Sequence, residues 1–434
     1  MLETRKTILV SDYNAPSDGQ TLATGQIQQA IDDAGNCGGK VILPQGKYLV
    51  GSIFLPSGIE FHIEAGAELI GTTDESQYKV MPSRVAGVEM EWPAGVLNVI
   101  GQKDVRITGE GVINGQGPFW WNKYWGTDRK GGMRKGYTEK GLRWAVDYDC
   151  TRPRNVIVMN SENIELSDFT SIRSGFWNVH ICYSSHVHIT GLKMGDNNGP
   201  STDGIDIDSC KDVLVERCEI SCNDDSVCIK SGRDADGLRV NRICEDILIR
   251  DCRLLAGSGI TLGSETSGGM QNIRVENIEY NGTAAGFRIK SARTRGGVIE
   301  NVVVNHLRMK NVANPFSFQL NWNPSYSYCE VPEDYTGEIP ERWKILSQRV
   351  PEEKGIPLVR NLLIKDVVAV LGDGYNGESY EGPSLAFDID AYEAKPMEDI
   401  TFEDVSITAK RFGNITGVKD LKWKNVQVTI QGNK

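Results

Sequence analysis

The sequence predicts an all-β chain that coils into a right-handed single-stranded parallel β-helix. One motif carries this prediction: an Asn, Asp or similar polar residue followed by two apolar residues separated by one position. Where the pattern is uninterrupted, its copies lie roughly 23 to 34 residues apart, the period of repeat folds. No helical pattern lies between them, which excludes βαβ units, so strands of successive turns must stack at about 4.8 Å. The copies begin at Asp104, Asn163, His186, Asp212, Asp246, Asn272, Asn301, Asn361, Asp399 and Asp420.

The chain is predicted to form one domain over residues 1–434, because the core of a repeat fold grows along a single axis. Residues 1–60 are expected to hold an N-terminal cap and the first coils. A short helix is predicted at residues 26–34, where Ile27, Ala30 and Ile31 follow helical spacing. This helix would cover the open end of the apolar core.

Two long segments interrupt the period, residues 117–150 and 313–357, and are predicted to be loop insertions that flank a cleft. Insertions in a solenoid emerge on one face, which is often the binding face. Aromatic rings there suit the apolar faces of sugars, and the alternative is that they only anchor the loops. Six of the nine tryptophans lie in these insertions: Trp120, Trp121, Trp125, Trp144, Trp322 and Trp343.

Composition excludes several classes of function. The net charge of −11 argues against general nucleic-acid binding, but a local basic patch can still hold an anionic substrate. No run of about 18 apolar residues occurs, so no membrane span is predicted. Ten cysteines in 434 residues do not define a disulfide scaffold, and those in alternating strands are interpreted as small buried hydrophobic residues. No CxxC pair has histidine partners, so a zinc site is not predicted. We also expect no cofactor.

The chemistry is concentrated in residues 201–231. Asp203 stands just before one alternating strand, and Asp224 and Asp225 stand just before another, about one coil later. If these strands stack as neighbours, three carboxylates meet on one patch of surface. Crowded carboxylates repel, so one retains its proton while another ionises, and inverting glycoside hydrolysis needs such an acid and base. The alternative is a set of solvated aspartates in turns.

A cationic pair follows two coils later, in the stretch GFRIKSARTRGG. Ile289 should point into the core, so Arg288 and Lys290 should project together from one face. A fixed cationic pair beside carboxylates suits a substrate that itself carries a carboxylate, for which arginine offers a planar fork. The alternative is a structural ion pair with the aspartates.

Several stretches occur in a characteristic order: QAIDDAGNCGGKVILPQGKYLVGSIFL, GEGVINGQGPFWW, GFWNVH, STDGID, NDDS, GSETSGG and FRIKS. Together they resemble glycoside hydrolase family 28, the polygalacturonase family, and look closest to its bacterial branch. The resemblance covers most of the chain. It implies a parallel β-helix that hydrolyses galacturonan-type pectin with inversion and without a metal.

Carried over position by position, the resemblance implies a role for each charged residue of the constellation. Asp224 matches the general acid. Asp203 and Asp225 match the carboxylates that hold and activate the water. Arg288 and Lys290 match the pair that binds the carboxylate of the substrate.

One position departs from the family. A Gly-His-Gly segment usually lies between the carboxylate pair and the Arg-x-Lys pair, whereas residues 256–259 read Ala-Gly-Ser-Gly. Ser258 is the candidate for the sugar contact that the histidine would make, and Trp177, in GFWNVH, is a candidate subsite wall. The histidines of the chain are interpreted as coil and surface residues: His62, His180, His186, His188 and His306.

The predicted function is therefore an inverting glycoside hydrolase that cleaves α-linked galacturonic-acid-containing pectic polysaccharide or oligosaccharide. The two long aromatic insertions favour exo action. The missing histidine leaves open a hydrolase specific for rhamnogalacturonan or branched pectin. Calcium-dependent pectate elimination and a non-catalytic carbohydrate-binding β-helix are further alternatives. The resemblance implies a secreted or periplasmic protein, although the chain begins without a signal peptide, and we expect it to act as a monomer.

Overall fold

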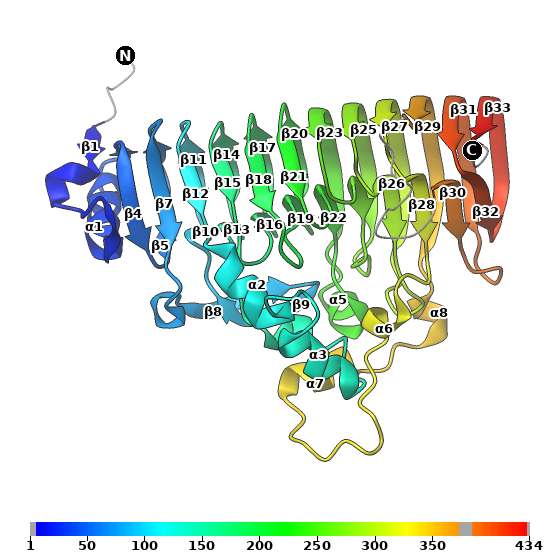
Figure 1. The fold of residues 1–434 in the computed structure, drawn as a ribbon, viewed down its shortest axis with the longest axis horizontal. Helices are drawn as coiled ribbons and strands as arrows, with labels where there is room; N and C mark the ends of the chain where they lie inside the picture. Colours follow the sequence, from blue (N-terminus) through cyan, green and yellow to red (C-terminus); the bar gives the residue numbers. More distant parts are fainter. Residues whose placement is uncertain (1–5, 373–383, 432–434) are drawn as a thin grey trace.

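The computed structural model describes residues 6–372 and 384–431, which form a stack of coils along the long axis of Figure 1. Strands of successive coils pair in parallel and build one sheet of 20 strands and one of 11. Among the described residues, β8 and β9 form the one antiparallel pair. The predicted right-handed parallel β-helix is confirmed.

The elements have the following bounds. The 20-stranded sheet contains β1 (Thr7–Leu9), β2 (Asp18–Leu22), β3 (Lys40–Leu43), β4 (Gly46–Val50), β6 (Glu60–Ile63), β7 (Ala67–Gly71), β11 (Lys103–Thr108), β12 (Val112–Asn114), β14 (Glu162–Ser167), β15 (Thr170–Ile172), β17 (Ser185–Thr190), β18 (Lys193–Asn197), β20 (Lys211–Glu216), β21 (Glu219–Cys222), β23 (Cys244–Leu254), β25 (Met270–Asn281), β27 (Val298–Lys310), β29 (Leu358–Val370), β31 (Met397–Ala409) and β33 (Val418–Ile430).

The 11-stranded sheet contains β5 (Ile53–Phe54), β10 (Leu97–Ile100), β13 (Val156–Met159), β16 (Val179–Cys182), β19 (Ile205–Asp208), β22 (Val227–Lys230), β24 (Ile260–Leu262), β26 (Ala285–Lys290), β28 (Asn314–Gln319), β30 (Leu385–Asp390) and β32 (Arg411–Thr416). The hairpin is β8 (Val80–Val85) and β9 (Val88–Pro93). The helices are α1 (Thr24–Gly35), α2 (Gly117–Trp125), α3 (Gly132–Glu139), α4 (Val146–Asp149), α5 (Asp234–Val240), α6 (Pro324–Ser327), α7 (Glu341–Leu346) and α8 (Glu352–Gly355), with short 3₁₀ turns at Val10–Tyr13 and Glu75–Gln77.

Each copy of the recurring motif begins with a residue in the left-handed backbone conformation. The starting residues have φ between 53° and 58°, from Asp399 to Asp246. Asn and Asp tolerate this conformation better than most residues, because their short polar side chains hydrogen-bond locally. Neighbouring coils are also linked there, since Asn272 Nδ2 donates to Asp246 Oδ1 at 2.9 Å. The polar residue of each copy thus places a left-handed residue inside a strand of the larger sheet, as Asn272 does in β25.

Asn272→Val is expected to destabilise the protein by about 2 kcal/mol, because a β-branched side chain strains a backbone at φ 56°. Asn272→Gly also loses the hydrogen bond to Asp246 but accepts the conformation, so it should cost at most about 1 kcal/mol. The midpoint of chemical denaturation measures both. Equal losses from the two variants would contradict the requirement for a left-handed residue.

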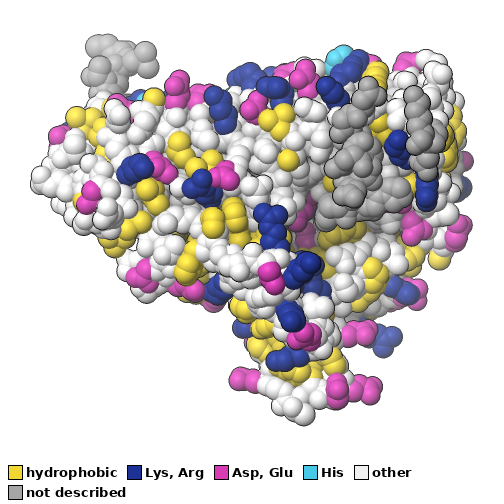
Figure 2. All heavy atoms as spheres, viewed as in Figure 1, with side chains coloured by type: hydrophobic (Ala, Val, Ile, Leu, Met, Phe, Trp, Pro, Cys, Tyr) yellow, Lys and Arg dark blue, Asp and Glu magenta, His cyan; other side chains and the backbone are white. Residues whose placement is uncertain are grey.

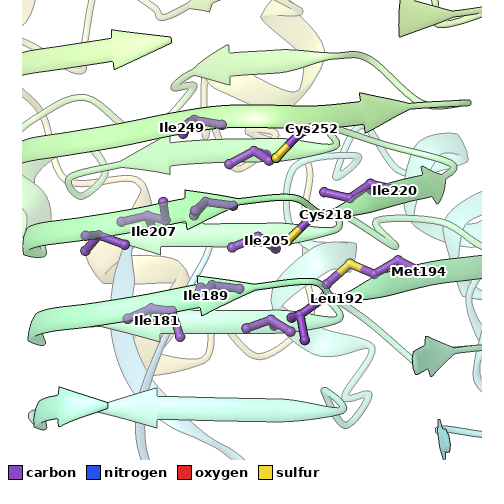
Figure 3. Packing of buried hydrophobic residues seen from close by; sticks show 14 of the residues in the cluster. Ile181, Ile189, Leu192, Met194, Ile205, Ile207, Cys218, Ile220, Ile249 and Cys252 are labelled. Carbon is purple, nitrogen blue, oxygen red and sulfur yellow. The ribbon is translucent and has the colours of Figure 1, made fainter. Parts of the chain in front are cut away.

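The core lies between the sheets and repeats from coil to coil. Ile205 and Ile207 of β19 point inward and are fully buried, as predicted. Figure 3 shows Ile181 of β16 and Ile207 in one row of like side chains, with Cys218 and Cys252 in a second row. The described cysteines are all unpaired and most are buried. Burial of such rows stabilises the stack by roughly 25 cal/mol for each Å² of apolar surface.

Helix α1 closes the N-terminal end of the stack, as predicted, although it is longer than residues 26–34. It buries Ile27, Ala30, Ile31 and Ala34 against the first strands. Among the described residues, no helix has both the length and the apolar character required to cross a membrane.

The insertions gather on one side of the coils, below the 11-stranded sheet in Figure 1. Residues 117–150 form α2 to α4, and α6 to α8 come from the second insertion. One boundary differs from expectation. Residues 314–319 form β28 of the sheet, so the second insertion begins after Gln319. The hairpin β8–β9 and helix α5 also leave the coils, and neither was predicted from the sequence.

On the face shown in Figure 2, Lys and Arg side chains lie among Asp and Glu side chains over both the coils and the insertions. No extended basic patch covers the described residues of this face. The distribution gives no support to nucleic-acid binding there.

Candidate active site

Asp203 and Asp225 lie on adjacent coils, as the period predicted. Each precedes its strand by two residues, and these strands, β19 and β22, pair in parallel with Ile205 opposite Val227. The Gly204 amide donates to the Asp225 carbonyl at 2.9 Å. A carboxylate oxygen of Asp203 lies within 4.8 Å of one of Asp225. That separation allows one water molecule to hydrogen-bond to both carboxyl groups.

Asp224 and Asp225 stand at the bend that the sequence suggested. The Asp225 amide donates to Asp224 Oδ1 at 3.0 Å, which fixes the orientation of the Asp224 carboxyl group. Asp224 is half-buried, whereas Asp225 is only 1% exposed. Both line one pocket together with Asp203, so the three carboxyl groups do converge.

The cations predicted from FRIKS reach this pocket through Asp225. Lys290 Nζ lies 2.6 Å from Asp225 Oδ2, and Arg288 Nη1 lies 3.7 Å from Asp225 Oδ1. Thr261 of β24, which sequence reasoning missed, donates its hydroxyl to Asp225 Oδ1 at 2.6 Å. Residues of the next two coils in the stack thereby hold the Asp225 carboxylate in place.

These contacts separate the pKa values of the three carboxyl groups. Burial and the charge of Asp225 raise the pKa of Asp224, and burial with the charge of Asp224 raises that of Asp203 well above its usual range. Burial would also raise the pKa of Asp225, but Lys290 and then Arg288 outweigh it and lower this pKa. One pocket therefore holds adjacent protonated and ionised carboxyl groups, the condition for acid and base catalysis.

Four further charged residues line the pocket and were not among the candidates: Arg143 and Asp147 of the first insertion, and Lys230 and Glu265. Lys230, at the end of β22, and Glu265, in GSETSGG, line the pocket and form a buried ion pair with Lys230 Nζ 3.0 Å from Glu265 Oε2. Lys230 Nζ also lies 3.6 Å from Asp206 Oδ1. The alternation of VCIKS placed Lys230 on the outer face, and this signal was available in the sequence.

The remaining candidates are Trp177 and Ser258, and only Trp177 lines the pocket. Trp177 is buried, lines the pocket and stacks on Phe176, with ring centroids 4.9 Å apart. Ser258 is fully buried on the turn beneath Asp224, where its amide donates to the Asp224 carbonyl at 2.8 Å. Its hydroxyl has no hydrogen-bond partner among the described residues and is not part of the pocket lining.

The tryptophans of the insertions serve mainly to anchor the loops. Trp120, Trp144 and Trp343 are at most 3% exposed, and the rings of Trp144 and Trp343 lie 5.4 Å apart. Trp322 is the exception, because it is half-buried, lines the pocket and has Lys290 Nζ 4.6 Å from its ring centroid. Trp322 therefore remains the candidate for contact with a sugar, whereas the other three tryptophans anchor the loops.

His180 lies on a strand of the coils, as expected, but it is not a surface residue. It is fully buried, with Nε2 3.8 Å from Asp208 Oδ2 and its ring 4.9 Å from that of Trp177. Burial lowers the pKa of His180 to about 4, so it is neutral near pH 7. His180 was expected at the surface because it points away from the core in the alternation of β16. The insertions cover the outer face of the coils at this position.

Two groups of side chains could supply metal ligands, because the relevant atoms of each lie within 4.8 Å of one another. They are Asp203, Asp225 and Cys228, and His180, Cys182 and Asp208. In the first group Lys290 already contacts Asp225, and in the second Arg84 Nη1 lies 2.9 Å from Asp208 Oδ1. A contacting ammonium or guanidinium neutralises a carboxylate as a cation would. We assign no metal to either group.

A pocket with paired acid and base carboxyls on a parallel β-helix defines a glycoside hydrolase. The sequence profile of glycosyl hydrolases family 28 matches residues 40–336, which is more than half of the chain. The chain belongs to this family, and the resemblance in its motifs is confirmed.

Individual relatives agree with this assignment. The chain is 29% identical over 409 residues to a probable polygalacturonase of Vitis vinifera, covering 91% of this chain and 73% of the relative. It is 29% identical over 328 residues to an endo-polygalacturonase of Pectobacterium carotovorum, covering 70% and 75%. An exopolygalacturonase from Thermotoga maritima superposes with a TM-score of 0.74 at 26% identity, over 98% of this chain and 89% of that chain.

Proposed function

We propose that the protein hydrolyses pectic chains that contain α-linked galacturonic acid, with inversion of configuration and from a chain end. The observation that carries the proposal is the opposite pKa shift of Asp224 and Asp225 in one pocket beside Arg288 and Lys290. The names of the relatives, polygalacturonase and exopolygalacturonase, support this substrate class.

Asp224 is the general acid. Its raised pKa keeps a proton available where an exposed aspartate would have lost it, and its half-buried position gives the carboxyl access to the substrate. The proton passes to the glycosidic oxygen as the bond to the anomeric carbon breaks. The backbone amide of Asp225 holds the other carboxyl oxygen in place.

Asp225 is the base that activates water. Lys290 and Thr261 hold its carboxylate ionised and oriented, so it can accept the proton of a water molecule that attacks the anomeric carbon. Asp203 retains its proton and supports the water from the neighbouring coil. Hydrolysis adds one water across the bond, and the proton that Asp224 loses balances the one that Asp225 gains.

Arg288 and Lys290 bind the carboxylate of one sugar. Both project from the outer face of β26, as Ile289 between them enters the core. Arg288 is 2% exposed, and the side chain of Lys290 is 5% exposed, so a bound carboxylate would be largely removed from water. A charge-assisted hydrogen bond in such surroundings is worth about 1.5–3 kcal/mol.

Exo action is supported by the walls of the pocket. The first insertion contributes Arg143 and Asp147, and the second contributes Trp322, Asn323 and Tyr326. Because helices of both insertions stand over the coils at this point, a long chain is expected to enter with one end only (Figure 1).

A product profile tests the proposal. We expect reducing sugar to be released from homogalacturonan as short products while the polymer shortens only slowly, with the β-anomer of galacturonate formed first in a proton NMR time course. The same screen includes xylogalacturonan and rhamnogalacturonan, because the buried Ser258 in place of a histidine leaves the side-chain tolerance of the site to be measured. An ultraviolet-absorbing unsaturated product would instead indicate elimination. Binding without release of reducing ends would indicate a non-catalytic protein.

We also propose that the protein acts as a secreted or periplasmic monomer, since a polysaccharide substrate is outside the cytoplasm. Cell fractionation and light scattering of the purified chain test these two statements.

A further inference from the structure

We infer that Arg233 is a positioning residue that holds both insertions over the pocket and thereby confines hydrolysis to chain ends. Arg233 is not among the described residues that line the pocket, so it acts through the loop residues that do. This inference rests on the proposed function, because it names the group that keeps the walls of the pocket in place.

Arg233 lies between the end of β22, at Lys230, and the start of α5, at Asp234. Its side chain is fully buried. Its amide donates to the carbonyl of Gly87, in the turn of the β8–β9 hairpin, at 2.9 Å. A Cβ on Gly87 would lie 2.8 Å from the Arg233 amide nitrogen, so this close approach requires glycine. The backbone of Arg233 thus fixes the hairpin, and its side chain is left for the insertions.

The guanidinium of Arg233 binds one residue from each insertion. Nη1 donates to the hydroxyl of Tyr148, in α4 of the first insertion, at 2.7 Å. Nη2 donates to the carbonyl of Tyr326, in α6 of the second insertion, at 2.6 Å. The Tyr148 hydroxyl in turn donates at 3.0 Å to the carbonyl of Ala86, a residue of the pocket lining. Because a planar guanidinium donates from both of its ends, one group ties both insertions to the coils.

The ring of Tyr326 carries this constraint to the pocket. Its centroid lies 4.4 Å from Cζ of Arg233 and 5.8 Å from Cζ of Arg143, which belongs to the first insertion. It also contacts the ring of Trp322, with the centroids 5.6 Å apart. Tyr326, Arg143 and Trp322 all line the pocket. Movement of Tyr326 would therefore displace wall residues from both insertions.

A looser wall would admit the interior of a long chain. Lysine in place of Arg233 keeps the positive charge but lacks the fork, so it can hold at most one of the two insertion residues. Loss of one charge-assisted hydrogen bond corresponds to about a 10- to 100-fold rise in the population with an open wall. Internal bonds would then reach Asp224 and Asp225, which the substitution leaves unchanged.

The ratio of internal to terminal cuts tests this inference. Homogalacturonan is digested by the wild-type enzyme and by Arg233→Lys until equal numbers of bonds are cleaved, and the product sizes are compared by size-exclusion chromatography. Arg233→Lys should raise the ratio about 10- to 100-fold. If Arg233→Lys lowers the stability of the fold but keeps the wild-type ratio, the inference is wrong and Arg233 is only structural.

Arg84→Lys is the matched control. Arg84 is also fully buried, but its guanidinium binds Asp208 and Ser209 of the coils. Both substitutions retain a positive charge, so neither Asp208 nor Asp234, which contacts Arg233, is left without a cation. Arg84→Lys should lower the midpoint of chemical denaturation and keep the wild-type ratio of cuts. An equal rise in the ratio for both variants would contradict a specific role for Arg233.

Tyr148→Phe is the second variant, and it decides the inference if Arg233→Lys does not fold. It keeps the ring and removes only the hydroxyl that lies between Arg233 and the Ala86 carbonyl. The ratio of internal to terminal cuts should again rise. An unchanged ratio in the folded Tyr148→Phe enzyme would overturn the inference.

Hydrogen exchange separates this inference from the proposed function. If the wild-type enzyme cuts internal bonds or cleaves no pectic chain, the proposed function fails, and confinement to chain ends fails with it. The positioning role is still decided by mass spectrometry of the peptides that contain Tyr148 and Tyr326. Both should exchange amide hydrogens about 10- to 100-fold faster in Arg233→Lys than in the wild type, and at the wild-type rate in Arg84→Lys. Equal exchange in Arg233→Lys and the wild type would show that Arg233 does not position the insertions.

Discussion

Asp224→Asn is expected to lower kcat on a pectic oligosaccharide by about 10²- to 10⁴-fold, the usual contribution of a general acid. The amide has nearly the same shape and can still accept the hydrogen bond from the Asp225 amide, so the loss should come from the missing proton. KM should change little, because in the proposed mechanism Arg288 and Lys290, and not Asp224, hold the carboxylate of the sugar. Initial rates of reducing-end release measure both constants. Retained turnover would sink the assignment of the acid.

The pH dependence of kcat/KM of the wild-type enzyme is a second test of Asp224 as the general acid. The proposed mechanism requires Asp225 ionised and Asp224 protonated. Lys290 and Arg288 lower the pKa of Asp225 against its burial, so the acid limb should lie below the usual aspartate value of 3.8. Burial and Asp225 raise the pKa of Asp224, so the alkaline limb should lie above 3.8. The profile of kcat/KM should therefore be bell-shaped, and the residual activity of Asp224→Asn should lack the alkaline limb.

Arg84→Met is expected to destabilise the fold by about 3–5 kcal/mol. Arg84, on the hairpin strand β8, and Asp208, on β19, are both fully buried, with Arg84 Nη1 2.9 Å from Asp208 Oδ1 and 2.7 Å from Ser209 Oγ. Removal of the guanidinium leaves an uncompensated buried carboxylate. The midpoint of chemical denaturation measures the loss.

An exposed ion pair of the same hairpin provides the control. Arg239 of α5 contacts Glu89 of β9 at 2.6 Å, and the Arg239 side chain is 61% exposed. Glu89→Gln should cost at most about 1 kcal/mol, because solvent screens this pair and Arg239 keeps its second contact, with the buried Asp236. The double variant Arg84→Met/Asp208→Asn should recover part of the stability by removing both buried charges. If Arg84→Met were as mild as Glu89→Gln, the buried pair would not be stabilising the hairpin on the coils.

The coil period made much of this site predictable. The left-handed residue inside each of these strands is Asn, Asp or a similar residue, and this preference is visible in the sequence at every copy of the motif. The period then places Asp203 and Asp225 on neighbouring coils, and the alternation of FRIKS places Arg288 and Lys290 on the outer face.

Contacts that cross the coils or come from the loops were not predictable in this way. Lys230 meets Glu265 on the next coil, and Arg84 meets Asp208 from a hairpin 124 positions earlier in the chain. No local pattern encodes such partners. His180 was misjudged for a related reason. Alternation shows which side of a strand a residue faces, but not whether a loop later covers that side.

The contact between Trp144 and Trp343 joins the two insertions to each other as well as to the coils. Asp149 strengthens it, because it accepts from Trp343 Nε1 at 3.0 Å and contacts Arg342. The insertions are thus halves of one interface, encoded almost two hundred residues apart. In evolutionary terms, neither can change length or sequence freely without a matching change in the other. A shift between closed and open pockets in related enzymes would require paired replacements, whereas single coils can diverge alone.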